Sequence, residues 1–147
     1  MNQSLISKWY ERYKNGIFRY ALSITKNTHL AEDVLHDTFV KVMSGGKQCE
    51  AGKEQAWLYR IARNLCYDRL RRAKFEQAHS KTPASSEERF EYIDLISGLS
   101  KVEREIVTLK IVGGLTHKEI GTVLKISETA AQKRYERAIR TLREKEG

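Results

Sequence analysis

The chain contains little cysteine and almost no proline. Its 147 residues include two cysteines, Cys49 and Cys66, and one proline, Pro83. The cysteines form no Cys-X-X-Cys pair and no Cys/His spacing typical of metal ligands, so the sequence supports neither a disulfide framework nor a structural zinc site. Because proline breaks helix interiors, its scarcity favours a folded, helix-rich chain.

Long hydrophobic runs and recognisable reaction centres are also missing. No segment approaches the roughly 20 apolar residues of a membrane-spanning helix, and the N-terminal residues lack the apolar core of a signal peptide. The sequence contains no nucleophile–base pair, glycine-rich phosphate loop or convincing metal-ligand set. We therefore expect a cytoplasmic protein without membrane insertion, cofactor or metal, and not an enzyme.

Positive charge is abundant. Lys and Arg number 27 against 19 Asp and Glu, which gives a net charge of +8. This balance favours a polyanionic partner, although charge alone does not separate DNA, RNA and a membrane surface. The length fits one domain or two very small ones.

The segment Ala56–Arg72 predicts a helix with two different faces. One face carries the apolar residues Leu58, Ile61, Ala62 and Leu65. The opposite face carries Arg60, Asn64, Tyr67 and Arg71. Guanidinium groups bind phosphates, and an aromatic ring and an amide suit an unstacked base, so this face indicates nucleic-acid binding; a solvated basic face is the alternative. Arg69 falls within the apolar stripe and must reach a carboxylate or emerge at the helix end.

An acidic surface is expected on the helix that Asn27 and Thr28 can cap. It contains Glu32, Asp33, His36 and Asp37. With His29, these side chains have spacing suited to metal ligation, but no group elsewhere in the chain completes a site. Docking of a basic protein partner is the favoured hypothesis, and an ordinary solvated face remains open.

The C-terminal part has the pattern of a helix-turn-helix. A short helix is predicted from Thr116 to Leu124, and Ser127 can cap a last helix from Glu128 to about Lys145. Gly121 allows the two helices to approach closely, whereas Lys125 occupies the turn position where glycine is usual. Unrelated three-helix bundles can imitate this pattern. The side chains expected near the major groove are Gln132, Lys133, Glu136, Arg137 and Arg140.

Polar segments without apolar periodicity separate these parts. Ser44–Gln55 contains three glycines and predicts a loop that could shape a pocket beside the Ala56–Arg72 helix. Ala73–Phe90 is read as a linker. We therefore expect an all-α fold of two small helical domains, an N-terminal bundle (1–72) and a C-terminal helix-turn-helix domain (91–147), joined by a short polar linker (73–90).

Three stretches together resemble an extracytoplasmic-function (ECF) sigma factor of bacterial RNA polymerase. HLAEDVLHDTFVKVM is similar to the family's polymerase-binding helix, AWLYRIARNLCYDRLRR to its promoter-opening and −10-reading helix, and the segment from Leu99 to Arg143 to its −35-reading domain. The three occur in the family's order around one linker and cover nearly the whole chain. The resemblance implies two domains of the sigma region 2 and region 4 types.

The resemblance also implies roles for individual residues. The clamp helices of the largest polymerase subunit would be contacted by Asp33, His36 and Asp37, and the flap of the second-largest subunit would be a further contact. The −10 element would be bound by Arg60, Asn64, Tyr67, Asp68 and Arg71, with the Ser44–Gln55 loop helping to capture a flipped base. The −35 duplex would be bound by Gln132, Lys133, Glu136 and Arg137. An anti-sigma factor is an expected further partner.

Two departures and two alternatives accompany this interpretation. His36 stands where the family commonly has glutamine, and Glu128-Thr129-Ala130-Ala131 replaces its usual Val-Gly-Thr-Val. The alternatives are a helix-turn-helix transcription regulator that never joins polymerase, and a sigma mimic that sequesters an anti-sigma factor. Charge reversal on the acidic surface would separate the first alternative from a sigma factor.

Overall fold

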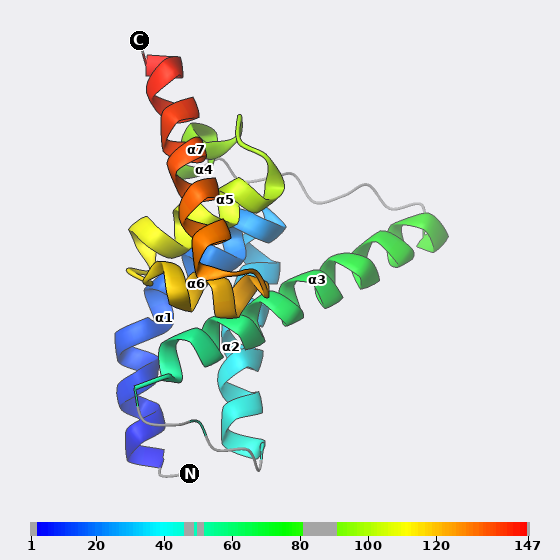
Figure 1. Cartoon of the computed structure of the whole chain (residues 1–147). Coiled ribbons are helices and arrows are strands. Elements are labelled where there is room, and N and C mark those ends of the chain that lie inside the picture. The colour runs from blue at the N-terminus through cyan, green and yellow to red at the C-terminus, as the bar shows by residue number, and fades with distance from the viewer. Residues whose placement is uncertain (1–2, 46–48, 50–51, 81–90, 147) are drawn as a thin grey trace.

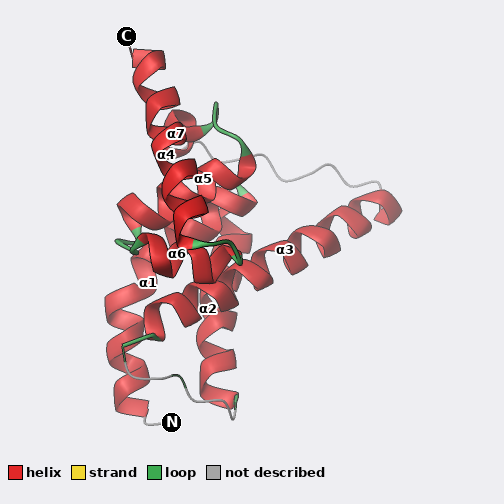
Figure 2. Ribbon diagram, viewed as in Figure 1, coloured by secondary structure: helices red, strands yellow, loops and turns green. Residues whose placement is uncertain are grey.

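The computed structural model describes residues 3–45, 49, 52–80 and 91–146, and this part of the chain is built from helices and their connections. The prediction of an all-α fold is confirmed (Figure 2). The helices are α1 (Gln3–Thr25), α2 (Thr28–Ser44), α3 (Glu54–Ser80), α4 (Glu91–Ile96), α5 (Lys101–Val107), η1 (Thr108–Val112, a π-helical turn), α6 (His117–Leu124) and α7 (Glu128–Glu146). Within the described residues, no helix combines the length and apolar character needed to cross a bilayer.

Helices α1, α2 and α3 pack against one another and form the N-terminal half of the chain. Asn27 caps α2, because its side-chain oxygen accepts a hydrogen bond from the backbone N–H of Leu30 at 3.1 Å. Helix α1 continues without a break through Gly16. Glycine is needed at this position because a Cβ atom would overlap the hydroxyl oxygen of Tyr59 on α3.

Helix α3 is longer than the sequence pattern predicts. It continues past Arg72 to Ser80, so the first eight residues assigned to the linker are helical, while 81–90 lie outside the described residues. In Figure 1 this end of α3 extends away from the other helices. Phe75 is accordingly 64% exposed. An exposed helix buries no apolar stripe, and therefore shows no apolar repeat in its sequence.

The predicted helix-turn-helix is confirmed in α6 and α7. Thr116 and Glu119 form the capping box that starts α6, and the Ser127 hydroxyl accepts a hydrogen bond from the backbone N–H of Ala130 at 3.0 Å at the start of α7. Lys125 adopts the left-handed conformation in the turn, with φ 60°. A Cβ atom at Gly121 would lie 2.6 Å from the carbonyl oxygen of Ile126, so the tight turn requires glycine there.

The two halves of the chain share one hydrophobic core. Helix α6 lies against α3, and η1 and α5 lie against α1. The core therefore combines N-terminal residues such as Ile17 and Leu58 with C-terminal residues such as Leu109 and Ile120. A smaller cluster ties α4 and α5 to α7 through Ile96, Leu99, Val107 and Ala138. The Gln55 side chain also donates a hydrogen bond to the carbonyl oxygen of Gly113 at 2.7 Å.

Candidate nucleic-acid interface

The predicted nucleic-acid face of α3 is divided between two clefts. Asn64, Tyr67 and Arg71 line a cleft of about 600 Å³ between α3 and α5, together with Arg63, Lys101, Val102 and Glu105. Arg60 instead lines a cleft of about 710 Å³, which α3 forms with α6. The structure thus brings three of the four predicted residues into one cleft and places the fourth in another.

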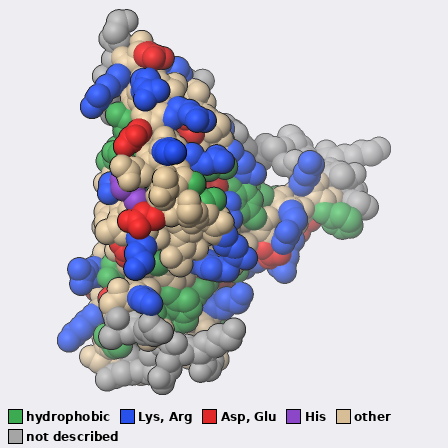
Figure 3. Space-filling model, in the orientation of Figure 1, with side chains coloured by type: hydrophobic (Ala, Val, Ile, Leu, Met, Phe, Trp, Pro, Cys, Tyr) green, Lys and Arg blue, Asp and Glu red, His purple; other side chains and the backbone are tan. Residues whose placement is uncertain are grey.

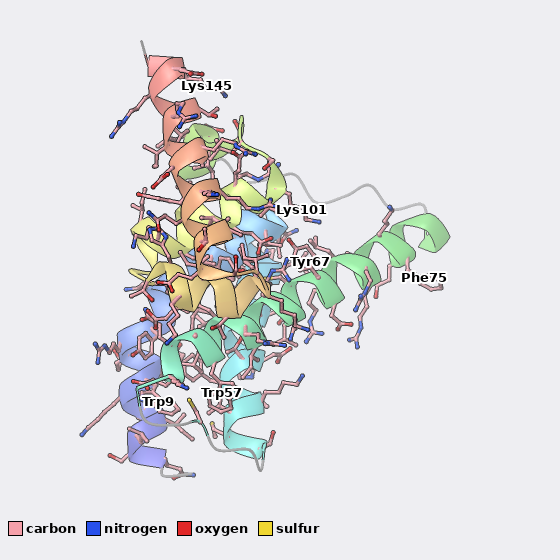
Figure 4. All side chains as sticks on the ribbon, in the orientation of Figure 1. Trp9, Trp57, Tyr67, Phe75, Lys101 and Lys145 are labelled. Carbon is pink, nitrogen blue, oxygen red and sulfur yellow. The ribbon has the colours of Figure 1, made fainter. Side chains whose placement is uncertain are left out.

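The cleft around Arg60 includes part of the predicted pocket loop. Its walls contain Trp57 from α3, Thr116 beside α6, and Cys49, Gly52 and Lys53 from the Ser44–Gln55 segment. Positions 46–48 and 50–51 of that segment lie outside the described residues. Trp57 also makes an edge-to-face contact with Trp9 at 6.4 Å between ring centroids (Figure 4), which fixes the start of α3 against α1.

The carboxylate of Glu105, which no sequence pattern singled out, joins the two halves beside Tyr67. Glu105 of α5 is 1% exposed. It accepts hydrogen bonds from the hydroxyl of Tyr20 at 2.7 Å, from Nε of Arg63 at 2.8 Å and from the hydroxyl of Tyr67 at 2.6 Å. All three donors belong to the N-terminal half, so this acidic side chain of the C-terminal half is held entirely from across the interface.

The donors around Glu105 are held in their protonated forms. Burial raises the pKa of Tyr20 well above its ordinary value, and the charge of Glu105 and its hydrogen bond add to this. Burial and the hydrogen bond to Glu105 also raise the pKa of the Tyr67 hydroxyl. Burial lowers the pKa of Arg63, but the hydrogen bond and the charge of Glu105 outweigh it and raise that pKa. Two neutral phenols and one guanidinium cation therefore donate to the carboxylate.

The ring of Tyr67 is also in contact with cations. The Nζ atom of Lys101 lies 4.4 Å from the ring centroid, and the guanidinium carbon of Arg63 lies 4.9 Å from it. Figure 4 shows Tyr67 on α3 and Lys101 on α5 close to each other. Both separations are within the range of cation–π attraction. The aromatic residue predicted to stack on a base is thus occupied through its ring and its hydroxyl.

Asp68 and Arg69 connect the acidic surface predicted on α2 with the basic face predicted on α3. Asp68 forms ion pairs with Arg69 at 3.2 Å, Arg71 at 3.4 Å and Arg72 at 3.3 Å. Arg69 reaches across to Asp37 of α2 and pairs with its carboxylate. Of the two outcomes expected for Arg69, a carboxylate partner and an exit at the helix end, the structure shows the carboxylate partner. On α2, Asp33 and His36 are exposed, whereas Asp37 is half-buried beside this arginine.

The predicted recognition residues of α7 share one exposed face. Gln132, Lys133, Glu136 and Arg137 are all exposed, and the Gln132 amide donates a hydrogen bond to the Glu136 carboxylate at 3.2 Å. Lys and Arg side chains are numerous over α7 and along α3 on the surface seen in Figure 3. Such a face combines cations for phosphates with amide and carboxylate groups for base edges. In the part of the chain that the structure describes, no group of three or more His, Cys, Asp or Glu side chains could hold a metal ion.

Comparison with known proteins gives two family matches along the chain. Residues 9–76 match sigma-70 region 2, and residues 89–142 match sigma-70 region 4. The ECF RNA polymerase sigma factor SigM of Bacillus subtilis is 32% identical over 84% of this chain and 83% of its own length. The RNA polymerase sigma factor CarQ of Myxococcus xanthus is 30% identical over 97% of this chain and 89% of its own length.

Two solved structures have a similar fold over nearly the whole chain. CnrH, in complex with the cytosolic domain of CnrY, has a TM-score of 0.72 and 26% identity over 96% of this chain and 86% of CnrH. The sigma factor RpoE of Bartonella quintana, in complex with the anti-sigma factor NepR, has a TM-score of 0.70 and 19% identity over 94% of both chains. At 19% identity, the similarity to RpoE concerns the fold alone.

Proposed function

This chain belongs to the sigma-70 family as an RNA polymerase sigma factor of the ECF type, and from that premise we propose how its surfaces divide the work of promoter recognition. As a sigma factor it binds core RNA polymerase and promoter DNA. The observation that carries the assignment of surfaces is the order of the two family regions, because region 2 contains the α3 face and region 4 contains the α7 face. We propose that the first face reads the −10 element and the second reads the −35 element.

The −10 element is bound by the face that starts at Arg60 and continues along α3. Asn64 and Arg71 are exposed, and they offer an amide to a base edge and a cation to a phosphate. Tyr67 supplies a ring for an unstacked base, once the contacts that now occupy it are released. Asp68 lies beside these residues, and its carboxylate pairs with three arginines. Asp68 contributes to the −10 surface by holding these cations in place for DNA.

The −35 duplex is bound by the exposed face of α7. In a helix-turn-helix, the second helix enters the major groove and side chains from its first turns reach base edges. Gln132 and Lys133 lie in that part of α7, and Glu136 and Arg137 follow one turn later. The hydrogen bond from Gln132 to Glu136 holds the amide beside the carboxylate, which favours one side-chain arrangement before DNA arrives.

Core polymerase is bound by the acidic surface of α2, formed by Asp33, His36 and Asp37. Asp33 and His36 are exposed and available to a basic partner such as the clamp helices of the largest subunit. Asp37 is already paired with Arg69, so it links this surface to the α3 face rather than contributing a full negative charge. Region 4 would contact the flap of the second-largest subunit.

The chain carries no catalytic activity of its own, because the polymerase that it joins performs the chemistry of transcription. It works in the cytoplasm, where that polymerase acts. An anti-sigma factor is a further partner: CnrH, to which the chain is similar over almost its whole length, was solved with the cytosolic domain of CnrY.

Charge reversal tests the polymerase-binding surface and separates a sigma factor from a polymerase-independent regulator. Asp33→Lys should weaken retention of bacterial core polymerase on the immobilised protein and should leave binding of duplex DNA unchanged. Asp94→Lys is the matched control, since it reverses an exposed charge on α4, away from this surface. Equal retention of polymerase by the two variants would contradict the assignment of the α2 surface.

A further inference from the structure

The end of α3 carries an exposed aromatic side chain to which the −10 face assigns no role. Phe75 is 64% exposed, one helical turn beyond Arg71. We propose that Phe75 contacts the duplex immediately upstream of the −10 element and reads a thymine there through its C5-methyl group, while Arg72 and Lys74 bind the phosphates on either side. This inference rests on the proposed −10 role of α3 and extends that role by one turn of the helix.

Phe75 lies on the same stripe of α3 as the predicted −10 residues. Positions 64, 68, 71 and 75 are three or four residues apart along the helix. Because each residue of a helix turns by about 100°, Asn64, Arg71 and Phe75 point within about 40° of one another. Figure 4 shows Phe75 near the end of α3 that extends away from the other helices. DNA that follows this stripe from Asn64 therefore meets Phe75 next.

The end of α3 has the dimensions and the exposure needed to enter a DNA groove. Positions 71, 72 and 74–76 are exposed, and this end projects from the rest of the molecule in Figure 1. An α-helix with its side chains is about 10–12 Å across, and the major groove of B-DNA is about 12 Å wide. The earlier turns of α3 pack against α1, α2 and α6, so they can present only one side to DNA.

Cations flank Phe75 on both sides of the helix. Arg72 points about 60° to one side of Phe75, and Lys74 about 100° to the other. The side chains of Arg71 and Arg72 are 77% and 67% exposed, and Asp68 pairs with both, at 3.4 and 3.3 Å. A DNA groove is bordered by a phosphate backbone on each side. A ring at the centre with cations at both edges is therefore complementary to duplex DNA.

The direction of the chain places this end of α3 over duplex upstream of the −10 element. The start of α3 lines a cleft with part of the Ser44–Gln55 segment, which is predicted to help capture a flipped base. The other end leads along the sequence to region 4, which is proposed to read the −35 element farther upstream. From Asn64 to Phe75 the helix rises by about 16 Å, which corresponds to about five base pairs of duplex. Phe75 should therefore read a position within about five base pairs upstream of the one that Asn64 reads.

A phenyl ring has one base-specific partner in paired, stacked DNA. The ring has no hydrogen-bonding group, and stacking on it would require an unstacked base. The apolar group that a base edge presents in the major groove is the C5-methyl group of thymine. Burial of one methyl-sized group corresponds to about fourfold in a binding constant. Phe75 should therefore favour thymine at this position by about fourfold.

The experiment first identifies the upstream position. Holoenzyme assembled from the full chain and purified bacterial core polymerase selects sequences from a library of random promoter-sized duplexes. We expect the selected promoters to carry an excess of thymine at one position within about five base pairs upstream of the −10 element. Phe75→Ala should lose this excess. Ile111→Ala is the matched control, since it removes another exposed apolar side chain, outside α3, and should keep the excess.

Binding to one selected promoter is then measured with thymine or deoxyuridine at that position, because deoxyuridine lacks only the methyl group. The unchanged and Ile111→Ala holoenzymes should bind the thymine duplex about fourfold more tightly. Phe75→Ala should bind the two duplexes equally. Lys74→Ala should keep the fourfold preference, weaken binding of both duplexes by the same factor, and reduce the dependence of log K on log salt by about 1.

Either of two results would overturn the inference: equal binding of the two duplexes by the unchanged holoenzyme, or a thymine preference that survives Phe75→Ala. Equal binding together with weaker retention of core polymerase by Phe75→Ala would assign the side chain to a polymerase contact instead. The proposed −10 role of α3 fails separately, if Asn64→Ala selects the same −10 sequence as the unchanged protein. A changed −10 sequence with Asn64→Ala, and an unchanged thymine excess with Phe75→Ala, would reject this inference alone.

Discussion

Substitution of Gly16 by alanine tests the close packing that joins α1, α3 and the C-terminal half. Gly16 lies inside α1, where alanine is normally favoured over glycine by about 0.8–1 kcal/mol. At this position, however, the added Cβ would overlap the hydroxyl oxygen of Tyr59 and would lie 3.4 Å from its Cζ atom. The same hydroxyl would lie 3.1 Å from a Cβ atom at Gly113 of the C-terminal half. Tyr59 is 1% exposed, so its ring has little room to move away.

The two effects have opposite signs, and their difference gives the expected result. Overpacking of a well-packed core costs about 1–3 kcal/mol. When the gain in helix propensity is subtracted from this overpacking cost, Gly16→Ala should lower the free energy of unfolding by about 0–2 kcal/mol. In a Tyr59→Phe background the clashing oxygen is absent, and Gly16→Ala should raise the stability of that background by up to about 1 kcal/mol. The coupling between the two sites should therefore be about 1–3 kcal/mol.

Urea unfolding of the four proteins of this cycle, followed by circular dichroism, measures that coupling. Asn15→Ala is the matched control, since it changes the neighbouring exposed helical position and should give only a small gain from helix propensity. Stabilisation of the otherwise unchanged protein by Gly16→Ala, equal to that found in the Tyr59→Phe background, would refute the packing argument.

Three further predictions concern the turn and the interface. Gly121→Ala should lower the free energy of unfolding by about 1–3 kcal/mol, because its Cβ would meet the Ile126 carbonyl oxygen at 2.6 Å, and urea unfolding beside the exposed neighbour Thr122→Ala measures it. Lys125→Gly should raise stability by up to about 1 kcal/mol, since a lysine at φ 60° is strained; a loss in the same assay would contradict this. Because burial raises the pKa of Tyr20 and Tyr67 in the folded state, the unfolded state loses these protons first, near pH 10. Stability should therefore be complete below that pH and fall above it by up to about 1.4 kcal/mol per pH unit for each tyrosine, and Tyr20→Phe should flatten the decline in urea titrations at alkaline pH.

Local sequence patterns predicted four helices, which correspond to α2, α3, α6 and α7, and caps for two of them. Asn27 and Ser127 each cap the helix expected to follow them, because capping depends on residues three positions apart. The C-terminal end of α3 was predicted too early. That prediction used the apolar stripe of a buried helix, and the last turns of α3 are exposed and carry no such stripe. Absence of an apolar stripe does not end a helix that contains no proline or glycine.

Contacts between the halves could not be predicted from local patterns. Tyr20 and Glu105 are 85 positions apart, and no periodicity links them. A partial signal was present, because Glu105 is spaced with Val102, Ile106 and Leu109 on the apolar face of its helix. The same signal at Arg69 led to the expectation of either a carboxylate partner or an exit at the helix end, and the structure shows the partner. A charged residue on an apolar face therefore indicates a buried partner, but only the folded structure identifies it.

Run-off transcription tests the central claim most directly. Purified bacterial core polymerase is mixed with a library of promoter-sized duplexes, with and without this protein. A sigma factor that reads the −10 element through α3 and the −35 element through α7 should give specific new transcripts. Asn64→Ala and Arg137→Ala should each reduce them strongly, while Asn15→Ala, which removes an exposed amide on α1, should not. New transcripts of equal yield from the Asn64→Ala, Arg137→Ala and unchanged proteins would contradict the account.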